Sequence, residues 1–204
     1  MDYYKEKQFI AYIDKNDKIL GKIEKWEAHK KGTLHRGFTA ILTYENQYLV
    51  QHRKHPVFDK VYDFSFSSHQ IFPPLLSSRA TLSDPELVEG ESKGSRGIYL
   101  QSNEEAIYTG LKREWNIEKK DIKSEPKFLK KFYYKAKDPN SDFTEHEIDY
   151  IYKVELKKLP SPNLDFAYGS KLIDKKEILN SEFLILNSNV APWVKIMIEE
   201  KIIK

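Results

Sequence analysis

The stretch "SNEEAIYTGLKREWNI", residues 102–117, is where the apolar pattern of the chain takes on a helical period. Ser102 is a typical helix N-cap residue, and Glu104 and Glu105 follow in the first turn, where carboxylates favour the helix dipole. Apolar side chains then recur at helical spacing, at Ala106, Ile107, Leu111 and Trp115. The stretch therefore predicts a helix with one apolar face.

Strand-like segments precede this helix. Residues 8–26 are typical of two short strands around an Asn-Asp turn. Phe38 to Tyr44 and Gln47 to His52 predict a hairpin, and residues 62–72, "YDFSFSSHQIF", predict a further strand.

Strand and helix patterns also follow the helix. Residues 127–137 and 146–156 are rich in β-forming residues, whereas 174–186 and 191–204 have a helical pattern. Hairpins, a helix, strands and a final helix make a mixed α/β fold rather than a regular βαβ repeat.

One segment, Pro73 to Gly97, departs from these patterns. It is rich in Ser, Pro, Gly and Glu and has no aromatic residue, which is typical of a disordered insert. Its words "SDPELVEGESKG" look like a translated repeat element, and a functional lid is the alternative. We therefore expect one domain over residues 1–204, interrupted by an insert at about 73–97.

The composition narrows the class of protein. With 40% hydrophobic residues among 204, the chain can form a core. Lys+Arg 34 nearly balance Asp+Glu 31, so charge gives no reason to expect nucleic acid as a partner. The absence of cysteine excludes disulfides, thiolate zinc sites and cysteine nucleophiles. We see no signal peptide and no membrane span, and expect a cytoplasmic protein.

Histidines and glutamates form a pattern with metal-binding chemistry. His29 and His35 flank a Gly turn, and His69 ends the predicted strand 62–72. Glu145 and Glu147 are two apart, so on a strand they project from one face. Imidazole and carboxylate ligands together suit Mg, Mn, Fe or Zn. On spacing alone, structural or solvated histidines are the alternative interpretation.

The serines beside His69 raise another alternative, a serine–histidine hydrolase. Such a site needs an acid that orients the histidine, an oxyanion hole and a sharp turn at the nucleophile. Ser67 and Ser68 lie on a predicted strand without a Gly-X-Ser-X-Gly turn, which disfavours this interpretation.

The predicted helix resembles a degenerate Nudix box, the helix motif with which that family binds magnesium and a diphosphate. Glu114 keeps its carboxylate in the box's frame. Five other positions of the motif are changed, at Gln101, Thr109, Gly110, Arg113 and Asn116. The resemblance implies a Nudix-type α/β/α sandwich around a mixed β-sheet.

Over about Ala11 to Ile198, without the insert, the chain resembles the type 1 isopentenyl diphosphate isomerases, which have a Nudix fold. In that family two N-terminal histidines, a strand histidine and a Glu-X-Glu pair hold a metal. The matching residues are His29, His35, His69, Glu145 and Glu147. Two further motifs match, at residues 134–139 and at Ala191-Pro192-Trp193.

This resemblance implies roles for individual residues. Glu147 and Tyr134 would deliver a proton to an alkene, and the Trp193 indole would stabilise the resulting cation. Magnesium bridged by Glu114 would hold the diphosphate, helped by Arg53 and Lys60. The implied cofactor is Mg or Mn, with Zn also possible, and the implied partner is a small-molecule diphosphate.

The chain departs from the isomerases at two places. Ser67 stands where the family carries its catalytic cysteine, and a hydroxyl is a far weaker acid than a thiol. The spacing of His29 and His35 is more similar to isomerase-like Nudix hydrolases. Three functions therefore stay open: an isomerase-like enzyme on a small organic diphosphate, a Nudix diphosphate hydrolase, and a Nudix domain without catalysis.

Overall fold

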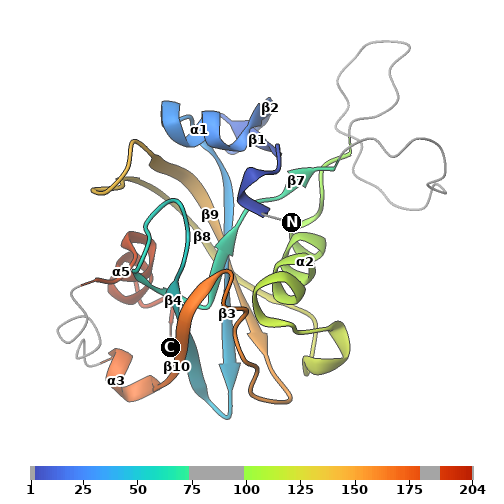
Figure 1. Ribbon diagram of the computed structural model, residues 1–204, viewed down its shortest axis with the longest axis vertical. Coiled ribbons are helices and arrows are strands. Elements are labelled where there is room, and N and C mark those ends of the chain that lie inside the picture. Colours follow the sequence, from blue (N-terminus) through green and yellow to red (C-terminus); the bar gives the residue numbers. More distant parts are fainter. Residues whose placement is uncertain (1–2, 74–98, 180–188, 204) are drawn as a thin grey trace.

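The protein is described by a computed structural model over residues 3–73, 99–179 and 189–203. In this part of the chain a mixed β-sheet lies between helices on its two faces (Figure 1). All but the first residue of the predicted insert, and the second half of the predicted helix 174–186, lie outside the described residues.

The N-terminal part of the chain supplies most of the strands. Its elements in order are η1 Tyr3–Lys5, β1 Phe9–Ile13, β2 Ile19–Glu24, α1 Lys25–Lys31, β3 His35–Tyr44, β4 Gln47–Arg53, β5 Tyr62–Phe64, β6 Phe66–Ser68 and β7 Ile71–Phe72.

The second part begins with the longest described helix. Its elements in order are α2 Asn103–Trp115, η2 Lys119–Asp121, β8 Lys127–Lys137, β9 Thr144–Glu155, β10 Ala167–Asp174, α3 Lys175–Leu179 and α5 Pro192–Glu199. Ser102 caps α2 as expected: its side chain accepts from the backbone N–H of Glu105, and the Glu105 side chain accepts from that of Ser102.

The sheet combines antiparallel hairpins with one parallel pair. Its main path runs β10-β4-β3-β1-β2, and β9 pairs with both β3 and β8. The β3–β9 pair is parallel, whereas β8 pairs with β9 antiparallel. Strand β9 therefore lies between two strands whose side chains can share one face with its own.

Helix α2 covers one face of this sheet. Its apolar side chains pack against Phe38, Ala40 and Leu42 of β3 and against Phe66 of β6. A Cβ atom added at Gly110 would lie 2.3 Å from the Phe66 ring. The glycine that replaces a charged residue of the family motif thus allows helix and strand to pack closely.

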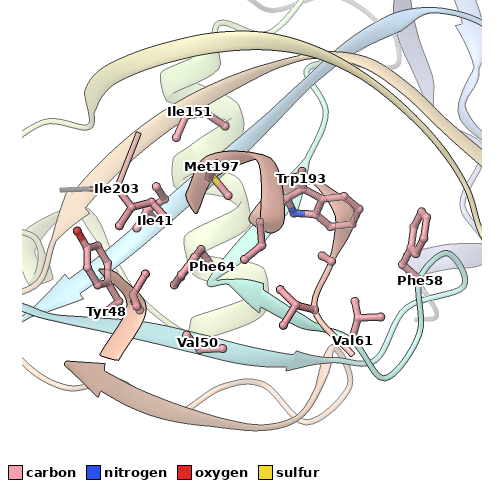
Figure 2. Close-up of a cluster of buried hydrophobic side chains, with 14 of the residues drawn as sticks. Ile41, Tyr48, Val50, Phe58, Val61, Phe64, Ile151, Trp193, Met197 and Ile203 are labelled. Carbon is pink, nitrogen blue, oxygen red and sulfur yellow. The ribbon is translucent and has the colours of Figure 1, made fainter. Parts of the chain in front are cut away.

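Helix α5 covers the opposite face. Trp193 and Met197 pack there with Ile41 of β3, Phe64 of β5 and Ile151 of β9 (Figure 2). Along β3, Ile41 belongs to this layer and its neighbours Ala40 and Leu42 to the α2 layer, as strand alternation requires. The predicted α/β/α sandwich around a mixed sheet is confirmed.

Three details differ from the sequence prediction. The predicted strand 62–72 is broken at Ser65, whose φ is 62° and whose hydroxyl donates to Leu49 O over 2.6 Å. Helix α1 was not predicted; Glu24 caps it by accepting from the backbone N–H of Glu27. Strand β10, which pairs with β4, was also not predicted.

Within the described residues, no helix has the length and apolar character that a membrane crossing requires.

Candidate active site

Strand register brings the first site residues together. In the parallel pair β3–β9, His35 lies opposite Glu147, and in the antiparallel pair β8–β9, Tyr134 lies opposite the same glutamate. Helix α1 adds His29, and His69 directly follows β6. The site thus forms on the α5 face of the sheet, where Tyr134 and Trp193 belong to the apolar layer.

The structure brings together all five residues that the sequence proposes as metal ligands. One ligand atom from each lies within 4.8 Å of every other, and all five residues are buried: His29, His35, His69, Glu145 and Glu147. Glu147 Oε1 lies 2.8 Å from His69 Nε2 and 3.2 Å from His35 Nε2. Glu145 Oε2 lies 3.1 Å from His29 Nε2.

The imidazoles are oriented as metal ligands usually are. His29 Nδ1 lies 2.6 Å from Lys25 O, and His35 Nδ1 lies 2.7 Å from Thr33 O. Because Nδ1 of each ring bonds a carbonyl, Nε2 faces the cluster, and it would offer its lone pair to a bound cation after losing any proton. Among the described residues, His29 Nε2 and Glu145 Oε2 are buried without a hydrogen-bond partner. These residues therefore fit a divalent cation.

The carboxylates keep their charge in the absence of a cation. Burial raises the pKa of Glu147, but hydrogen bonds from His35 and His69 outweigh it and hold the pKa well below its usual range. Burial also opposes ionisation of Glu145, yet the nearby His29 leaves its pKa lowered. Conversely, burial lowers the pKa of His69 to about 4, despite Glu147.

The glutamate at the centre of the cluster needs a glycine beneath it. A Cβ atom added at Gly37 would lie 2.5 Å from the carboxylate of Glu147. Gly37 stands on β3 two residues after His35, on the same face. The sequence "HRG" thus places an imidazole and the space for its partner carboxylate side by side.

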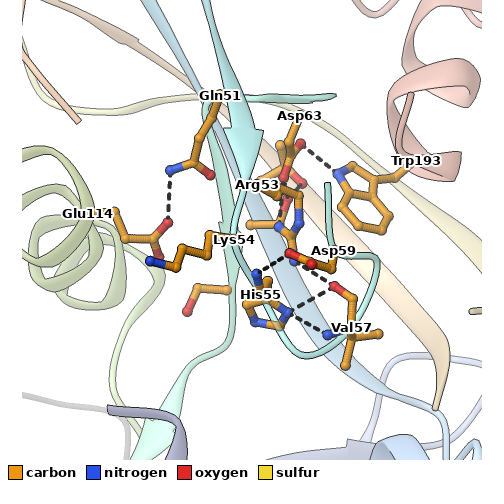
Figure 3. A network of polar contacts seen from close by, with 12 residues as sticks. Gln51, Arg53, Lys54, His55, Val57, Asp59, Asp63, Glu114 and Trp193 are labelled. Atoms are coloured by element: carbon orange, nitrogen blue, oxygen red, sulfur yellow. Dashed lines mark hydrogen bonds and ion pairs between the residues drawn. The ribbon is translucent and has the colours of Figure 1, made fainter. Parts of the chain in front are cut away.

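A second polar group adjoins the cluster. Tyr134 Oη donates to Glu147 Oε2 over 2.7 Å, and the Tyr134 ring lies 5.9 Å from that of Trp193. Burial and the charge of Glu147 raise the pKa of Tyr134 well above its usual range, so the phenol keeps its proton. The Trp193 indole N–H donates to Asp63 Oδ1 over 2.8 Å (Figure 3).

Glu114 lies apart from the cluster, on α2. It is buried, its Oε1 accepts from Arg113 over 2.7 Å, and its Oε2 accepts from Gln51 over 3.4 Å (Figure 3). Arg53 interacts electrostatically with both Glu114 and Glu145. Within the described part of the chain, Arg53 Nε is buried without a hydrogen-bond partner, so one guanidinium donor is available.

The remaining two predicted residues differ in their surroundings. Ser67 is half-buried on β6, and its hydroxyl donates to Asp63 Oδ2 over 3.0 Å. Lys60 has an exposed side chain on the loop between β4 and β5, outside the group formed by the other residues. The substrate-binding role of Lys60 stays a prediction.

Three buried charged residues near the site escaped the sequence prediction. Lys25 is 3% exposed and interacts with both Glu145 and Glu114; burial lowers its pKa, and these carboxylates oppose the shift. Asp63 is 1% exposed. Asp149 continues the alternation of Glu145 and Glu147, which is the one signal that could have identified it; burial and Glu147 raise its pKa well above the usual range.

Comparison with known proteins shows which proteins have a similar sequence. No protein-family model matches the chain. Isopentenyl-diphosphate Delta-isomerase 1 of Bos taurus is 27% identical over 206 residues, which cover 97% of this chain and 83% of the relative. The protein of the same name from Photorhabdus laumondii is 25% identical over 189 residues, covering 91% and 90%.

Solved structures share the architecture. DR0079 from Deinococcus radiodurans superposes with a TM-score of 0.59 at 14% identity, over 94% of this chain and 98% of that one. A MutT Nudix hydrolase from Burkholderia pseudomallei gives a TM-score of 0.51 at 13% identity, over 82% and 97%. The chain has the Nudix fold. The prediction of a Nudix-type fold with similarity to isopentenyl diphosphate isomerases is confirmed.

Proposed function

We propose that the protein is a divalent-metal-dependent enzyme that moves a double bond in a small organic diphosphate; its curated relatives are named as isomerases of isopentenyl diphosphate. The observation that carries this proposal is the position of the Glu147 carboxylate. Its Oε1 faces two imidazoles of the five-residue cluster, and its Oε2 accepts the proton of Tyr134. One carboxylate thus connects a cation site to a proton donor.

The acid side of the reaction follows from this contact. A cation held by the cluster would orient Glu147 and balance its charge. Tyr134 Oη carries the proton that is shared with Glu147 Oε2, and it points from β8 into the apolar layer that contains Trp193. With the alkene carbon bound beside Tyr134 and shielded from solvent, this hydrogen-bonded pair would be the source of the proton.

The indole of Trp193 would stabilise the cation formed by this protonation. The ring is 1% exposed and lies beside Tyr134, so a positive charge formed there has the quadrupole of the ring nearby. Arg53 lies 5.1 Å from the centroid of the same ring, and its charge is balanced by Asp63 at 2.9 Å. The arrangement leaves no uncompensated positive charge from Arg53 against the indole.

Positively charged side chains that interact with Glu114 and with the metal-ligand cluster would hold the diphosphate. Lys25 and Arg53 each interact with both Glu114 and Glu145, and Arg113 pairs with Glu114. Glu114 would hold a magnesium ion, which would help to neutralise the charge of the diphosphate. For the cluster itself, three nitrogen and two oxygen donors favour Mn or Zn over Mg, which prefers oxygen ligands.

The test is an isomerisation assay. The protein is purified without metal, loaded separately with Mn, Mg or Zn, and incubated with isopentenyl diphosphate while dimethylallyl diphosphate is followed by NMR. We expect interconversion with at least one metal and none after chelation. Absence of turnover with every metal contradicts the isomerase function.

A Nudix diphosphate hydrolase is the second candidate, favoured by Glu114 and by Ser67 in place of the family's cysteine. Glu114 on α2 stands where the Nudix box has a carboxylate. It interacts with three positively charged side chains, those of Arg113, Lys25 and Arg53. This candidate requires phosphate release from nucleoside or prenyl diphosphates and its loss in Glu114→Gln. Diphosphate binding in calorimetry without turnover in either assay would instead indicate a Nudix domain without catalysis.

A further inference from the structure

Strand β8 carries more positive charge than the balanced composition of the whole chain indicates. Its 11 residues, "KFLKKFYYKAK", contain lysine at five positions and no acid. Lys130 and Lys131 each form an ion pair with an acid. Within the described part of the chain, Lys135 and Lys137 form none, so their charges are available to a partner. Lysine on a sheet edge commonly prevents strand pairing, but that function does not require the aromatic residues that accompany it here.

The strand register places these lysines and several aromatic rings on one face of the sheet. Lys131 lies opposite Tyr150 and Phe128 opposite Tyr152 in the β8–β9 pair. Alternation along β8 adds Tyr133 to the same face. We call this the basic aromatic face, which consists of Phe128, Lys131, Tyr133, Lys135 and Lys137 of β8 and Tyr150 and Tyr152 of β9.

The outer half of the basic aromatic face is open to solvent. Tyr150 and Tyr152 pack partly against the apolar layer under α2. On β8, by contrast, Phe128 is 49% exposed and Tyr133 is 58% exposed. Tyr134 follows Tyr133 and points to the other face, where it contacts Glu147. The basic aromatic face therefore lies across the sheet from the metal-ligand cluster.

The exposed rings are held in place against the sheet. Tyr133 Oη lies 2.9 Å from His146 Nε2, and His146 Nδ1 lies 2.7 Å from Gly32 O. The Phe128 ring packs edge-on against that of Tyr152, with centroids 5.5 Å apart. A ring that is already oriented loses little conformational freedom when a partner stacks on it.

We propose that the basic aromatic face binds single-stranded RNA or DNA, with bases stacked on Tyr133 and Phe128 and phosphates held by Lys135 and Lys137. Exposed rings on a sheet, flanked by cations, provide both contacts that single strands require. The inference goes beyond the proposed function and does not depend on it.

Two other partners fit the basic aromatic face less well. A second copy of the chain would bring lysines against lysines, which repel each other. An anionic membrane attracts lysines but also takes up apolar side chains that project into the lipid. Tyr133 and Phe128 do not project in this way, because His146 and Tyr152 hold them against the sheet.

The experiment titrates the full chain into fluorescein-labelled oligo(U) and oligo(dT) of about ten nucleotides and follows anisotropy. We expect Tyr133→Ala to raise Kd by roughly fivefold to 100-fold, because a stacked base is lost, and Tyr133→Phe to change it by less than about twofold. A duplex of equal length should bind at least about tenfold more weakly, since its bases are already stacked on each other. Tyr168→Ala, which removes an exposed ring on β10, is the control.

The salt dependence separates the lysines from the rings. In Lys135→Gln the slope of log Kd against log salt concentration should fall by about 0.7, because one phosphate is no longer neutralised. Tyr133→Ala should leave this slope unchanged. Lys112→Gln on α2, also exposed, is the control for a general loss of charge.

Several results would overturn the proposal. Absence of binding to either oligonucleotide does so. Binding that Tyr133→Ala leaves intact, or that pyrophosphate with Mn displaces, would be electrostatic or would belong to the metal site. Binding of phosphatidylserine vesicles without oligonucleotide binding would assign the face to a membrane, and a dimer that Tyr133→Ala dissociates would assign it to a second copy. If melting shows Tyr133→Ala to be unfolded, Phe128→Ala decides, since it must raise Kd in the same way. Because no turnover is measured, an inactive chain refutes only the proposed function.

Discussion

Helix α2 and the strand pair β3–β9 both present buried carboxylates, but in opposite ways. Glu114 of α2 is already satisfied by Arg113 and Gln51. Within the described residues, Glu145 Oε2 of β9 and His29 Nε2 of α1 lie 3.1 Å apart and are buried, and neither atom makes a hydrogen bond. The groups that fit a cation therefore gather on the sheet, although the family resemblance is first visible in the helix.

The difference has a backbone cause. Register in the sheet is fixed by ladder hydrogen bonds, so His35 and Tyr134 must both lie opposite Glu147. A helix face offers a metal site only if several positions carry ligands. In α2 such positions now hold Gly110, which admits the Phe66 ring, and Arg113, which neutralises Glu114.

The largest effect should follow from Glu147→Gln. The variant keeps its shape but loses the charge that faces two imidazoles, and its single amide oxygen can serve either the imidazoles or Tyr134 but not both. We expect turnover to fall by about 10³-fold or more, because acid–base and metal functions are lost together. Steady-state kinetics measure the loss, with Glu155→Gln on the same strand as the control. Equal losses in both variants would contradict the central role of Glu147.

A slightly smaller effect is expected from Gly37→Ala. The added methyl would lie 2.5 Å from the Glu147 carboxylate, which must move. We expect Mn affinity to fall by roughly 10-fold to 100-fold, as when the surroundings of metal ligands are changed, and stability to fall by about 1–3 kcal/mol. Calorimetry and denaturant melts measure these changes. Unchanged Mn affinity would show that the position of Glu147 does not matter to the metal.

Glu114→Gln tests the other region, helix α2. We expect the Kd for pyrophosphate to rise roughly tenfold, about 1.4 kcal/mol, while Mn affinity at the cluster stays the same. Glu118→Gln, just after the helix, is the control. If Glu114→Gln abolishes Mn binding at the cluster, the two regions are not separate sites.

The pH dependence of metal binding should come from His29. Burial lowers its pKa, but Glu145 outweighs burial and raises it above 6.5, so His29 tends to hold a proton that a cation must displace. Mn affinity should therefore rise with pH above 6.5, until the folded pKa is passed. Calorimetry at pH 7 in buffers of different ionisation enthalpy measures the released proton. His29→Asn should release less; an equal release would assign the proton to another group.

The smallest effect is expected from deletion of residues 73–96. Hydrogen bonds hold the residues on either side of this segment close together. Gln101 N donates to Ile71 O over 3.1 Å, and Gln70 Nε2 donates to Gln101 O over 2.7 Å. A short connection can therefore replace it at little entropic cost. We expect the melting temperature to change by less than about 4 °C, roughly 1 kcal/mol or less. Loss of the melting transition would show that the segment is structural.

Much of this architecture follows from local signals in the sequence. The capping residue Ser102 and the apolar spacing gave α2, and Glu45-Asn46 gave the β3–β4 turn, where both residues have positive φ. Helix α1 gave no such signal, because its seven residues are mostly polar and its structure depends on the Glu24 cap and on burial of Ala28 and His29.

The site residues also divide into those that the sequence predicted and those that it did not. Strand alternation and the family resemblance together nominated the five residues of the cluster. Asp63 could not be nominated, because two of its partners are Arg53, ten residues away, and Trp193, 130 residues away. Lys25 was missed because a charged residue at the start of a short helix is ordinarily exposed, whereas here it is 3% exposed.

The central claim is that the cation site lies on the sheet, and anomalous scattering from crystals grown with Mn tests it most directly. We predict one strong peak within ligand distance of His29, His35 and His69 Nε2 and of the carboxylates of Glu145 and Glu147. A peak at Glu114 alone, or no peak among these five residues, would contradict the account.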